Sequence, residues 1–241
     1  MARYPSRAPA RSSSDAGGVA AVDRALMLLS AFQPGDRELT LAALAGRTQL
    51  VKSTALRLLA SLAHAGFVRR SPSGLYTLGP EIARLASLFS PSFTLEADVM
   101  PVLQELTART RETAAYHVRR DDKRLCLYRV DSPQVLRDHG RVGDIFPLDR
   151  GAGGRVLSAF EGARGAAYEK IRRDGYAALK GDRIPDIAGI SAPVFGPDGT
   201  LVGAVTLSLP THRYREKFVA PVVAAAKALT ARLGGAAPPA P

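Results

Sequence analysis

Apolar residues recur at helical spacing near the front of the chain. The spacing predicts a helix over residues 22–32 with one apolar face, ended by the Pro-Gly-Asp turn at 34–36. That face is made of Val22, Ala25, Leu26, Leu29 and Phe32. Further helices are predicted over residues 41–47, with Thr40 as the N-cap, and over residues 52–65, ended by Gly66.

The pattern then changes from helical to alternating. Residues 67–70 and 75–78 predict two short strands, joined by the turn sequence Ser-Pro-Ser-Gly. Three helices followed by a hairpin predict a winged helix-turn-helix domain over residues 19–79. Pro80 suits the first position of a linker helix over residues 80–94. Residues 1–18 and 235–241, which have little to bury, are expected to be a disordered arm and tail.

The rest of the chain, residues 95–234, predicts a second domain of mixed elements. Helices are expected over residues 95–110, 155–160, 163–173 and 218–233, and strands over 113–118, 124–130, 190–195 and 201–209. Neighbouring strands joined by short turns favour a mostly antiparallel sheet flanked by helices. The fold class is therefore α/β, of the α+β type.

The charged residues are unevenly distributed, and the front domain is the more basic one. The chain has 33 Lys and Arg against 22 Asp and Glu, a net charge of +11, and residues 1–90 carry eleven basic but only five acidic side chains. This bias favours a polyanionic partner for the front domain. No apolar run is long enough for a membrane span or a secretory signal, so a cytoplasmic protein is expected. One cysteine and four scattered histidines predict neither a disulfide nor a metal site, and no cofactor is expected.

The third predicted helix has the pattern of a helix that enters a DNA major groove. Ala55, Leu58, Leu59 and Leu62 would dock it, while polar side chains of its first turns project elsewhere, and basic residues lie on the wing. The pattern alone also fits a solvated helix beside a charged hairpin. The predicted DNA contacts are Thr40, Lys52, Ser53, Thr54, Arg57, Arg69, Arg70 and Ser73.

Several segments together resemble one protein family. AVDRALMLLSAF, LTLAALAGRTQLVKSTALRLLASLAHAGFVRR and GLYTLGPEIARLA resemble the N-terminal domain of the IclR family of bacterial transcriptional regulators. PLDRGAGGRVLSAF and GISAPVFGPDGTLVGAVTLSLP resemble its effector-binding domain, and the match runs from about residue 19 to 233. The resemblance implies a winged helix-turn-helix, a linker helix used in dimerisation, and a GAF-like domain that binds a small, often carboxylate-bearing metabolite. It also implies a dimer or tetramer on a palindromic operator.

The DNA-binding turn departs from the family pattern. Where the family commonly has Gly and then Pro before Lys-Ser-Thr, this chain has Gln49 and Val51. The turn must therefore form without those two backbone aids.

A candidate effector site lies at residues 149–155, where small residues open a helix. Free amides at a helix N-terminus attract anions, so a carboxylate is the expected ligand. The family match places Gly151, Ala152, Gly153, Thr206 and Ser208 in the pocket. Leu179 and Gly189 stand where some members use an acidic residue and a cysteine to hold small keto acids, and the segment between Phe160 and Ile171 is shorter than usual. These departures favour a larger, more apolar carboxylate, a class that includes aromatic acids, with Leu179 and Ile190 in the wall.

Two functional classes other than a regulator, an enzyme and a protein-binding sensor, have some support in the sequence. Tyr116 with His117, and Asp138 with His139, are adjacent in sequence, so their side chains point apart and neither pair is a ready catalytic dyad. The Gly-x-Ser-x-Gly elbow and the phosphate-binding loop signature are both missing, so no enzyme is predicted. The alternative is a ligand-sensing protein whose basic front domain binds a protein partner. Whether the regulator activates or represses is left open by the sequence.

Overall fold

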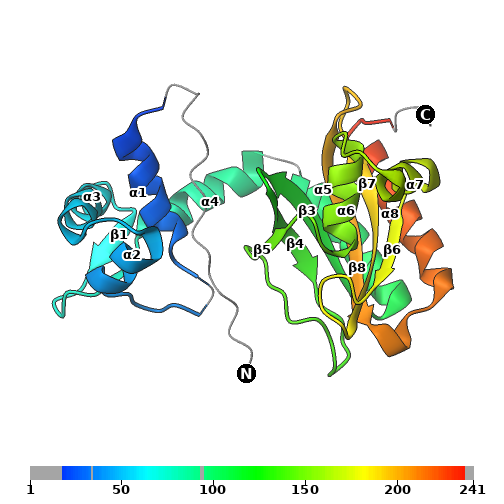
Figure 1. Cartoon of the computed structure of the whole chain (residues 1–241), viewed down its shortest axis with the longest axis horizontal. Helices are drawn as coiled ribbons and strands as arrows, with labels where there is room; N and C mark the ends of the chain where they lie inside the picture. The colour runs from blue at the N-terminus through cyan, green and yellow to red at the C-terminus, as the bar shows by residue number, and fades with distance from the viewer. Residues whose placement is uncertain (1–17, 34, 93–94, 237–241) are drawn as a thin grey trace. The chain divides into compact units, whose positions relative to one another are not determined.

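The computed structural model describes residues 18–33, 35–92 and 95–236, and the predicted arm and tail lie largely outside these residues. The chain divides into two compact units with the boundary between Ser92 and Phe93 (Figure 1). Each unit has its own hydrophobic core. No helix among the described residues has the length and apolar character needed to cross a bilayer.

The first unit is a winged helix-turn-helix. It comprises α1 (Ala20–Ser30), α2 (Leu41–Thr48), α3 (Lys52–His64), β1 (Val68–Arg70), β2 (Tyr76–Leu78) and α4 (Pro80–Ser92). The two strands pair antiparallel, with Val68 opposite Leu78, and Leu39 adds a bridge to Tyr76. The hydroxyl of Thr40 accepts a hydrogen bond from the Ala43 amide at 3.0 Å and caps α2, as the sequence predicts.

The apolar face predicted for α1 is wrong in part. Val22 and Leu26 are each 54% exposed, whereas Leu28, absent from the predicted face, is fully buried. The helix has two apolar stripes, and the buried one is Ala25, Leu28, Leu29 and Phe32, at positions i, i+3, i+4 and i+7. The helical period alone does not distinguish two apolar stripes on one helix, so the predicted face combined residues of both. Only the packing shows which stripe faces the core.

The second unit is a single antiparallel sheet with helices on both faces. Its six strands lie in the order β5-β4-β3-β8-β7-β6, and every neighbouring pair is antiparallel. The strands are β3 (Thr113–Arg120), β4 (Lys123–Val130), β5 (Ile145–Pro147), β6 (Ala177–Lys180), β7 (Ile187–Phe195) and β8 (Leu201–Pro210). The fold class predicted from the sequence is confirmed.

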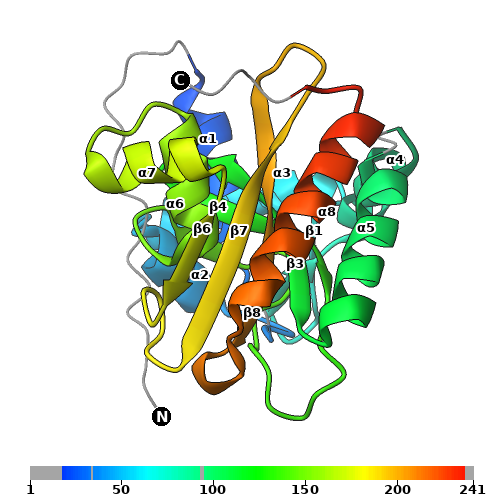
Figure 2. The ribbon, with the colours of Figure 1, turned by 90° about the vertical axis from the view of Figure 1, so that its right-hand side faces the viewer.

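The helices of this unit form two layers. α5 (Leu95–Thr110) and α8 (Val219–Arg232) cover one face of the sheet, and α6 (Gly151–Phe160) covers the other, with α7 (Ala166–Asp174) packed beside it (Figure 2). Two 3-10 turns, Thr211–Arg213 and Glu216–Phe218, connect β8 to α8. On β7, Ala188, Ile190, Ala192 and Val194 belong to the core under α5 and α8. The alternate residues, Gly189 and Ser191, therefore face α6.

The sequence pattern misses two strands and misplaces two helix starts. β5 and β6 were not predicted because three- and four-residue strands are too short to show a period. α6 begins at Gly151 rather than near Arg155, and α7 begins at Ala166 rather than at 163. Gly-Ala-Gly-Gly is a poor helix former, but close packing holds it helical, since a Cβ on Gly154 would lie 2.4 Å from the Leu148 carbonyl oxygen.

Candidate nucleic-acid interface and ligand cavity

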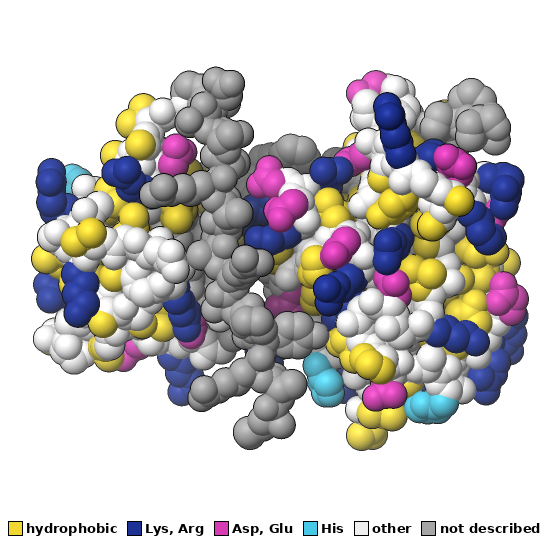
Figure 3. Space-filling view, viewed as in Figure 1, with side chains coloured by type: hydrophobic (Ala, Val, Ile, Leu, Met, Phe, Trp, Pro, Cys, Tyr) yellow, Lys and Arg dark blue, Asp and Glu magenta, His cyan; other side chains and the backbone are white. Residues whose placement is uncertain are grey.

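The third helix of the first unit presents a polar side to solvent. Lys52, Ser53 and Arg57 are exposed and Thr54 is half-buried. The docking face contains the apolar residues predicted for it, with Ala55 and Leu59 fully buried, Leu62 8% exposed and Leu58 half-buried. Figure 3 shows Lys and Arg side chains at the outer edge of this unit, where Figure 1 places α3.

The turn before α3 keeps its backbone geometry without glycine or proline. Gln49, the C-cap of α2, has φ 56° and ψ 26°, the left-handed conformation in which glycine is favoured. Val51, the N-cap of α3, has φ −61°, close to the value that a proline ring imposes. The replacements therefore leave the course of the turn intact, and Gln49 bears a conformational cost.

The wing adds two cations beside the helix. Arg69 and Arg70 on β1 are exposed, as is Ser73 in the turn, whose hydroxyl lies 2.7 Å from that of Ser71. The guanidinium of Arg70 lies 5.8 Å from the ring centroid of Tyr76, a cation–π contact that orients the side chain along the hairpin. Thr40 is exposed at the start of α2, and its hydroxyl hydrogen remains available to a phosphate acceptor while its oxygen caps the helix.

In the second unit, a cavity lies between the start of α6 and the sheet. Residues predicted for an effector site line it: Gly151, Ala152, Gly153, Leu179, Thr206 and Ser208. Ile190 does not. It is fully buried in the core under α5 and α8, because neighbouring residues of β7 point to opposite faces, and the face of β7 that borders the cavity is that of Ile187 and Gly189.

Most of the cavity's charge comes from residues that the sequence reading missed. These are His117, Arg124, Arg129, Asp138, Asp182 and Arg183, together with the ring of Phe146. They come from β3, β4, β5 and two loops that are distant in sequence. Alternation along β4 is the one sequence signal for Arg124. It places Arg124 on the same face of the strand as Cys126, and these two are the most buried residues of β4. The loop residues carry no local pattern. The wall is consequently more cationic than the apolar cavity predicted.

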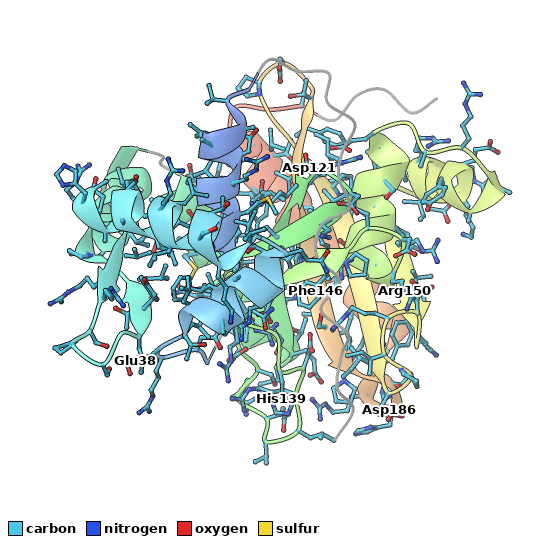
Figure 4. All side chains as sticks on the ribbon, turned by 60° about the vertical axis from the view of Figure 1, so that its left-hand side comes forward. Glu38, Asp121, His139, Phe146, Arg150 and Asp186 are labelled. Atoms are coloured by element: carbon cyan, nitrogen blue, oxygen red, sulfur yellow. The ribbon has the colours of Figure 1, made fainter. Side chains whose placement is uncertain are left out.

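Arg124 is a buried cation. Its side chain crosses from β4 to α6, donating from Nη1 to the carbonyl oxygens of Arg150 at 2.6 Å and of Pro147 at 3.3 Å. Its guanidinium lies 5.2 Å from the centroid of Phe146, which is labelled in Figure 4 together with Arg150. Burial, reinforced by the nearby charge of Arg183, lowers the pKa of Arg124 to about 10. Its Nε has no hydrogen-bond partner among the described residues.

His117 belongs to a buried polar chain across the sheet. Its Nδ1 lies 3.2 Å from the Thr206 hydroxyl, which lies 2.9 Å from the hydroxyl of Ser191. Ser191 in turn donates to the Val205 carbonyl at 3.0 Å. Burial, followed by the charges of three nearby arginines, lowers the pKa of His117 well below 6.5, so the ring is neutral at pH 7. Neither His117 with Tyr116 nor the buried Asp138 with the exposed His139 forms a dyad.

The N-terminus of α6 already holds a carboxylate from the chain itself. Asp182 accepts from the Gly151 amide at 2.6 Å and pairs with Arg155 at 3.2 Å. Burial works against ionisation of Asp182, but these hydrogen bonds outweigh it and lower the pKa. The first amide of the helix is therefore occupied. The amides of Ala152 and Gly153 have no acceptor among the described residues and remain as donors at the cavity.

Asp138 holds the other rim of the cavity. It lies on the loop between β4 and β5, and both of its carboxylate oxygens accept from Arg183 at 3.1 Å. Arg129 approaches the same carboxylate at 3.7 Å and also pairs with Asp131 at 2.6 Å. The guanidinium of Arg183 also packs over the ring of Phe146, 4.9 Å from its centroid. This network joins the two loops that line the cavity.

A winged helix joined in one chain to an α/β domain with a polar cavity defines a two-domain DNA-binding protein. Residues 21–72 match the family model of the IclR helix-turn-helix domain, and residues 91–168 and 166–233 match that of the bacterial transcriptional regulator IclR C-terminal domain. The chain belongs to the IclR family of bacterial transcriptional regulators, and it is a regulator rather than an enzyme.

Individual proteins are similar to this chain over most of their length. The glycerol operon regulatory protein of Streptomyces griseus is 30% identical over 222 residues, which cover 82% of this chain and 87% of that protein. A putative IclR regulator of Silicibacter sp. superposes with a TM-score of 0.79 at 26% identity, covering 91% of this chain and 98% of that one. An IclR homologue from Microbacterium hydrocarbonoxydans, solved with 4-hydroxybenzoate, has a TM-score of 0.75 at 22% identity, covering 89% and 99%.

Proposed function

We propose that this regulator binds operator DNA through α3 and the wing, and that a small organic acid in the cavity of the second unit changes its affinity for DNA. The observation that carries the DNA interface is the set of exposed cations, Lys52, Arg57, Arg69 and Arg70, on a winged helix-turn-helix. Lys52 and Arg57 contact bases or phosphates in the major groove, with hydroxyl donors at Ser53 and Thr54. Thr40, Ser73 and the two wing arginines contact phosphates.

The interface is tested by fluorescence anisotropy with DNA from upstream of the protein's own gene and with scrambled DNA, at two salt concentrations. If Arg57 reads a base, Arg57→Ala weakens operator binding by about 1–3 kcal/mol and leaves scrambled DNA unaffected. Arg69→Ala weakens binding to both DNAs and lowers the salt slope by about 1, because a phosphate contact is lost.

Arg119→Ala is the matched control, since this arginine lies in the second unit and pairs with Glu161. Unchanged operator affinity in Arg57→Ala removes that residue from the interface. If a selection for bound genomic sites yields none, the front domain is better explained as a docking site for a protein partner.

The ligand is proposed to be a carboxylate of moderate size, a class that includes aromatic acids. Arg124, Ser208 and the free amides of α6 offer donors to the cavity, while Phe146 and the aliphatic side chains of Leu179 and Ile187 supply apolar wall. The 4-hydroxybenzoate bound to the Microbacterium homologue is a ligand of this class and a suitable first probe. Its effect on DNA affinity equals the difference in its affinity for the free and DNA-bound arrangements.

The regulator is proposed to act as a dimer, or a pair of dimers, on a palindromic operator. Helix-turn-helix dimers read two half-sites related by the same symmetry as the protein. The second apolar stripe of α1, made of Val19, Val22 and Leu26, is more than half exposed in the single chain and suits a second copy. Leu26→Asp is expected to shift the protein towards monomer in analytical ultracentrifugation. An unchanged sedimentation coefficient rejects this stripe as the interface.

A further inference from the structure

The charged side chains that line the cavity are paired, with one exception. Arg129 and Arg183 share the carboxylate of Asp138, and Asp182 pairs with Arg155. Arg124 has no carboxylate within 4.0 Å among the described residues, although it is only 4% exposed. A buried charge with no counter-ion is strongly unfavourable, because two carbonyl groups replace only part of its hydration.

The overall charge of the cavity leads to the same residue. Three arginines and two aspartates line it, and His117 is neutral, so the wall carries one positive charge in excess. Counting the direct partners Arg155 and Asp131 leaves this excess unchanged. A ligand with one negative charge therefore brings the site to neutrality. A ligand with two leaves a buried negative charge, and an uncharged ligand leaves Arg124 uncompensated.

The space around Arg124 is built to receive polar atoms. A Cβ on Gly153 would lie 2.9 Å from the Thr206 hydroxyl, 3.5 Å from Nε of Arg124 and 3.6 Å from Nδ1 of His117. Glycine thus lets the helix start approach three polar groups from three strands, β3, β4 and β8. The unpartnered Nε is among them, and an unsatisfied buried N–H in a native structure calls for an acceptor that binds there.

We propose that the cavity selects singly charged organic acids, and that Arg124 is the residue that sets this preference by neutralising the ligand's carboxylate. The inference rests on the proposed ligand-binding function and deepens it. Phe146, Leu179 and Ile187 supply apolar wall for the remainder of the ligand, and the charges of Arg129 and Arg183 are already paired with Asp138, so an uncharged remainder fits this part of the cavity. Asp182 keeps its place at the Gly151 amide, so that the ligand meets the amides of Ala152 and Gly153 instead.

A purely structural role for Arg124 is the competing explanation. Its bonds to the carbonyls of Arg150 and Pro147 tie β4 to the start of α6, so its removal would loosen the sheet edge whatever the ligand. The two explanations predict different results for one measurement, the ratio of affinities for singly charged, doubly charged and neutral probes of similar shape. A loss of fold stability alone does not change this ratio.

The test is calorimetric titration of the full-length protein at constant ionic strength with three probes. These are 4-hydroxybenzoate, the doubly charged terephthalate and the neutral 4-hydroxybenzamide. The wild-type protein is expected to bind 4-hydroxybenzoate at least about tenfold more tightly than either of the others, a factor that one poorly screened charge pair readily supplies. Arg124→Met is expected to lose this preference, and Arg124→Lys to retain it in weaker form. Arg119→Met, an exposed arginine on the neighbouring strand β3, is the control that leaves it unchanged.

Equal affinities of the wild type for the singly and doubly charged probes would overturn the proposal, as would a preference that survives in Arg124→Met. Binding of none of the probes to the wild type also overturns it for acids of this size. If Arg124→Met does not fold by circular dichroism, the Arg124→Lys variant and the wild-type ratio still decide the outcome. Operator binding by the unliganded proteins is measured in parallel, so that failure of the DNA-binding function is recognised separately.

Discussion

At the scale of single residues, Gln49 shows how a turn survives the loss of its usual residue. A left-handed backbone places the side chain close to its own carbonyl, which costs about 1 kcal/mol in a residue other than glycine. Gln49→Gly is therefore expected to raise the free energy of unfolding of the first unit by about 1 kcal/mol in urea denaturation. Ala60→Gly, at an exposed position inside α3, should lower it by a similar amount. A loss of stability in both variants would show that the side chain of Gln49 makes a contribution larger than its backbone cost.

His117 makes stability depend on pH. Because its pKa is lowered in the folded state, the unfolded chain binds the proton more readily once the pH falls below about 6.5, and the resulting stability is present above that pH and lost below it. The contribution falls by up to about 1.4 kcal/mol per pH unit. Urea denaturation of the second unit between pH 7.5 and 5.5 should show this slope, and His117→Gln should flatten it. His64→Gln, on the exposed side of α3, should leave the slope unchanged.

At the scale of elements, one face of β7 contributes to stability and the other to ligand binding. Its alternate residues face either the core under α5 and α8 or the cavity under α6, so adjacent positions have different tasks. Ile190→Val is expected to cost about 0.5–1.5 kcal/mol of stability, by thermal denaturation, with no change in probe affinity. Gly189→Val should change probe affinity, since a Cβ there meets Ala152 at 3.3 Å. A change in the ratio of probe affinities in Ile190→Val would show that Ile190 does contribute to the ligand cavity.

In some helices the spacing of apolar residues identifies the buried face, and in others only the packing does. The docking residues of α3 form a single stripe, and the helical period identifies them. α1 has two apolar stripes. Packing against α2 and α3 decides which stripe is buried, and the sequence of α1 alone does not contain that information. The start of α6 was predicted four residues late for a related reason. Its glycines disfavour a helix locally, and contacts with Leu148, Thr206 and Arg124 compensate for them.

At the scale of the whole molecule, the two units have separate cores and are expected to unfold separately. Residues 1–92 and 93–241, expressed as two proteins, should each melt cooperatively by circular dichroism. In the intact chain, 4-hydroxybenzoate should raise the melting temperature of the second unit alone, because a ligand stabilises the unit that binds it. A single transition that shifts as a whole with this acid would contradict independent unfolding.

The sequence by itself determined the class of the protein and all its long elements, but not the short strands β5 and β6. Helical and alternating periods are local, and the residues of α3 and the wing that carry the DNA-binding pattern lie within one continuous stretch of chain. The cavity was decided by tertiary structure. Its charged groups come from β4 and from two loops that the antiparallel sheet brings together, so no local period relates Arg124 to Asp182 or Asp138. Pairing within that cluster determines which charge is left without a partner, and pairing depends on distance in space rather than on distance along the chain.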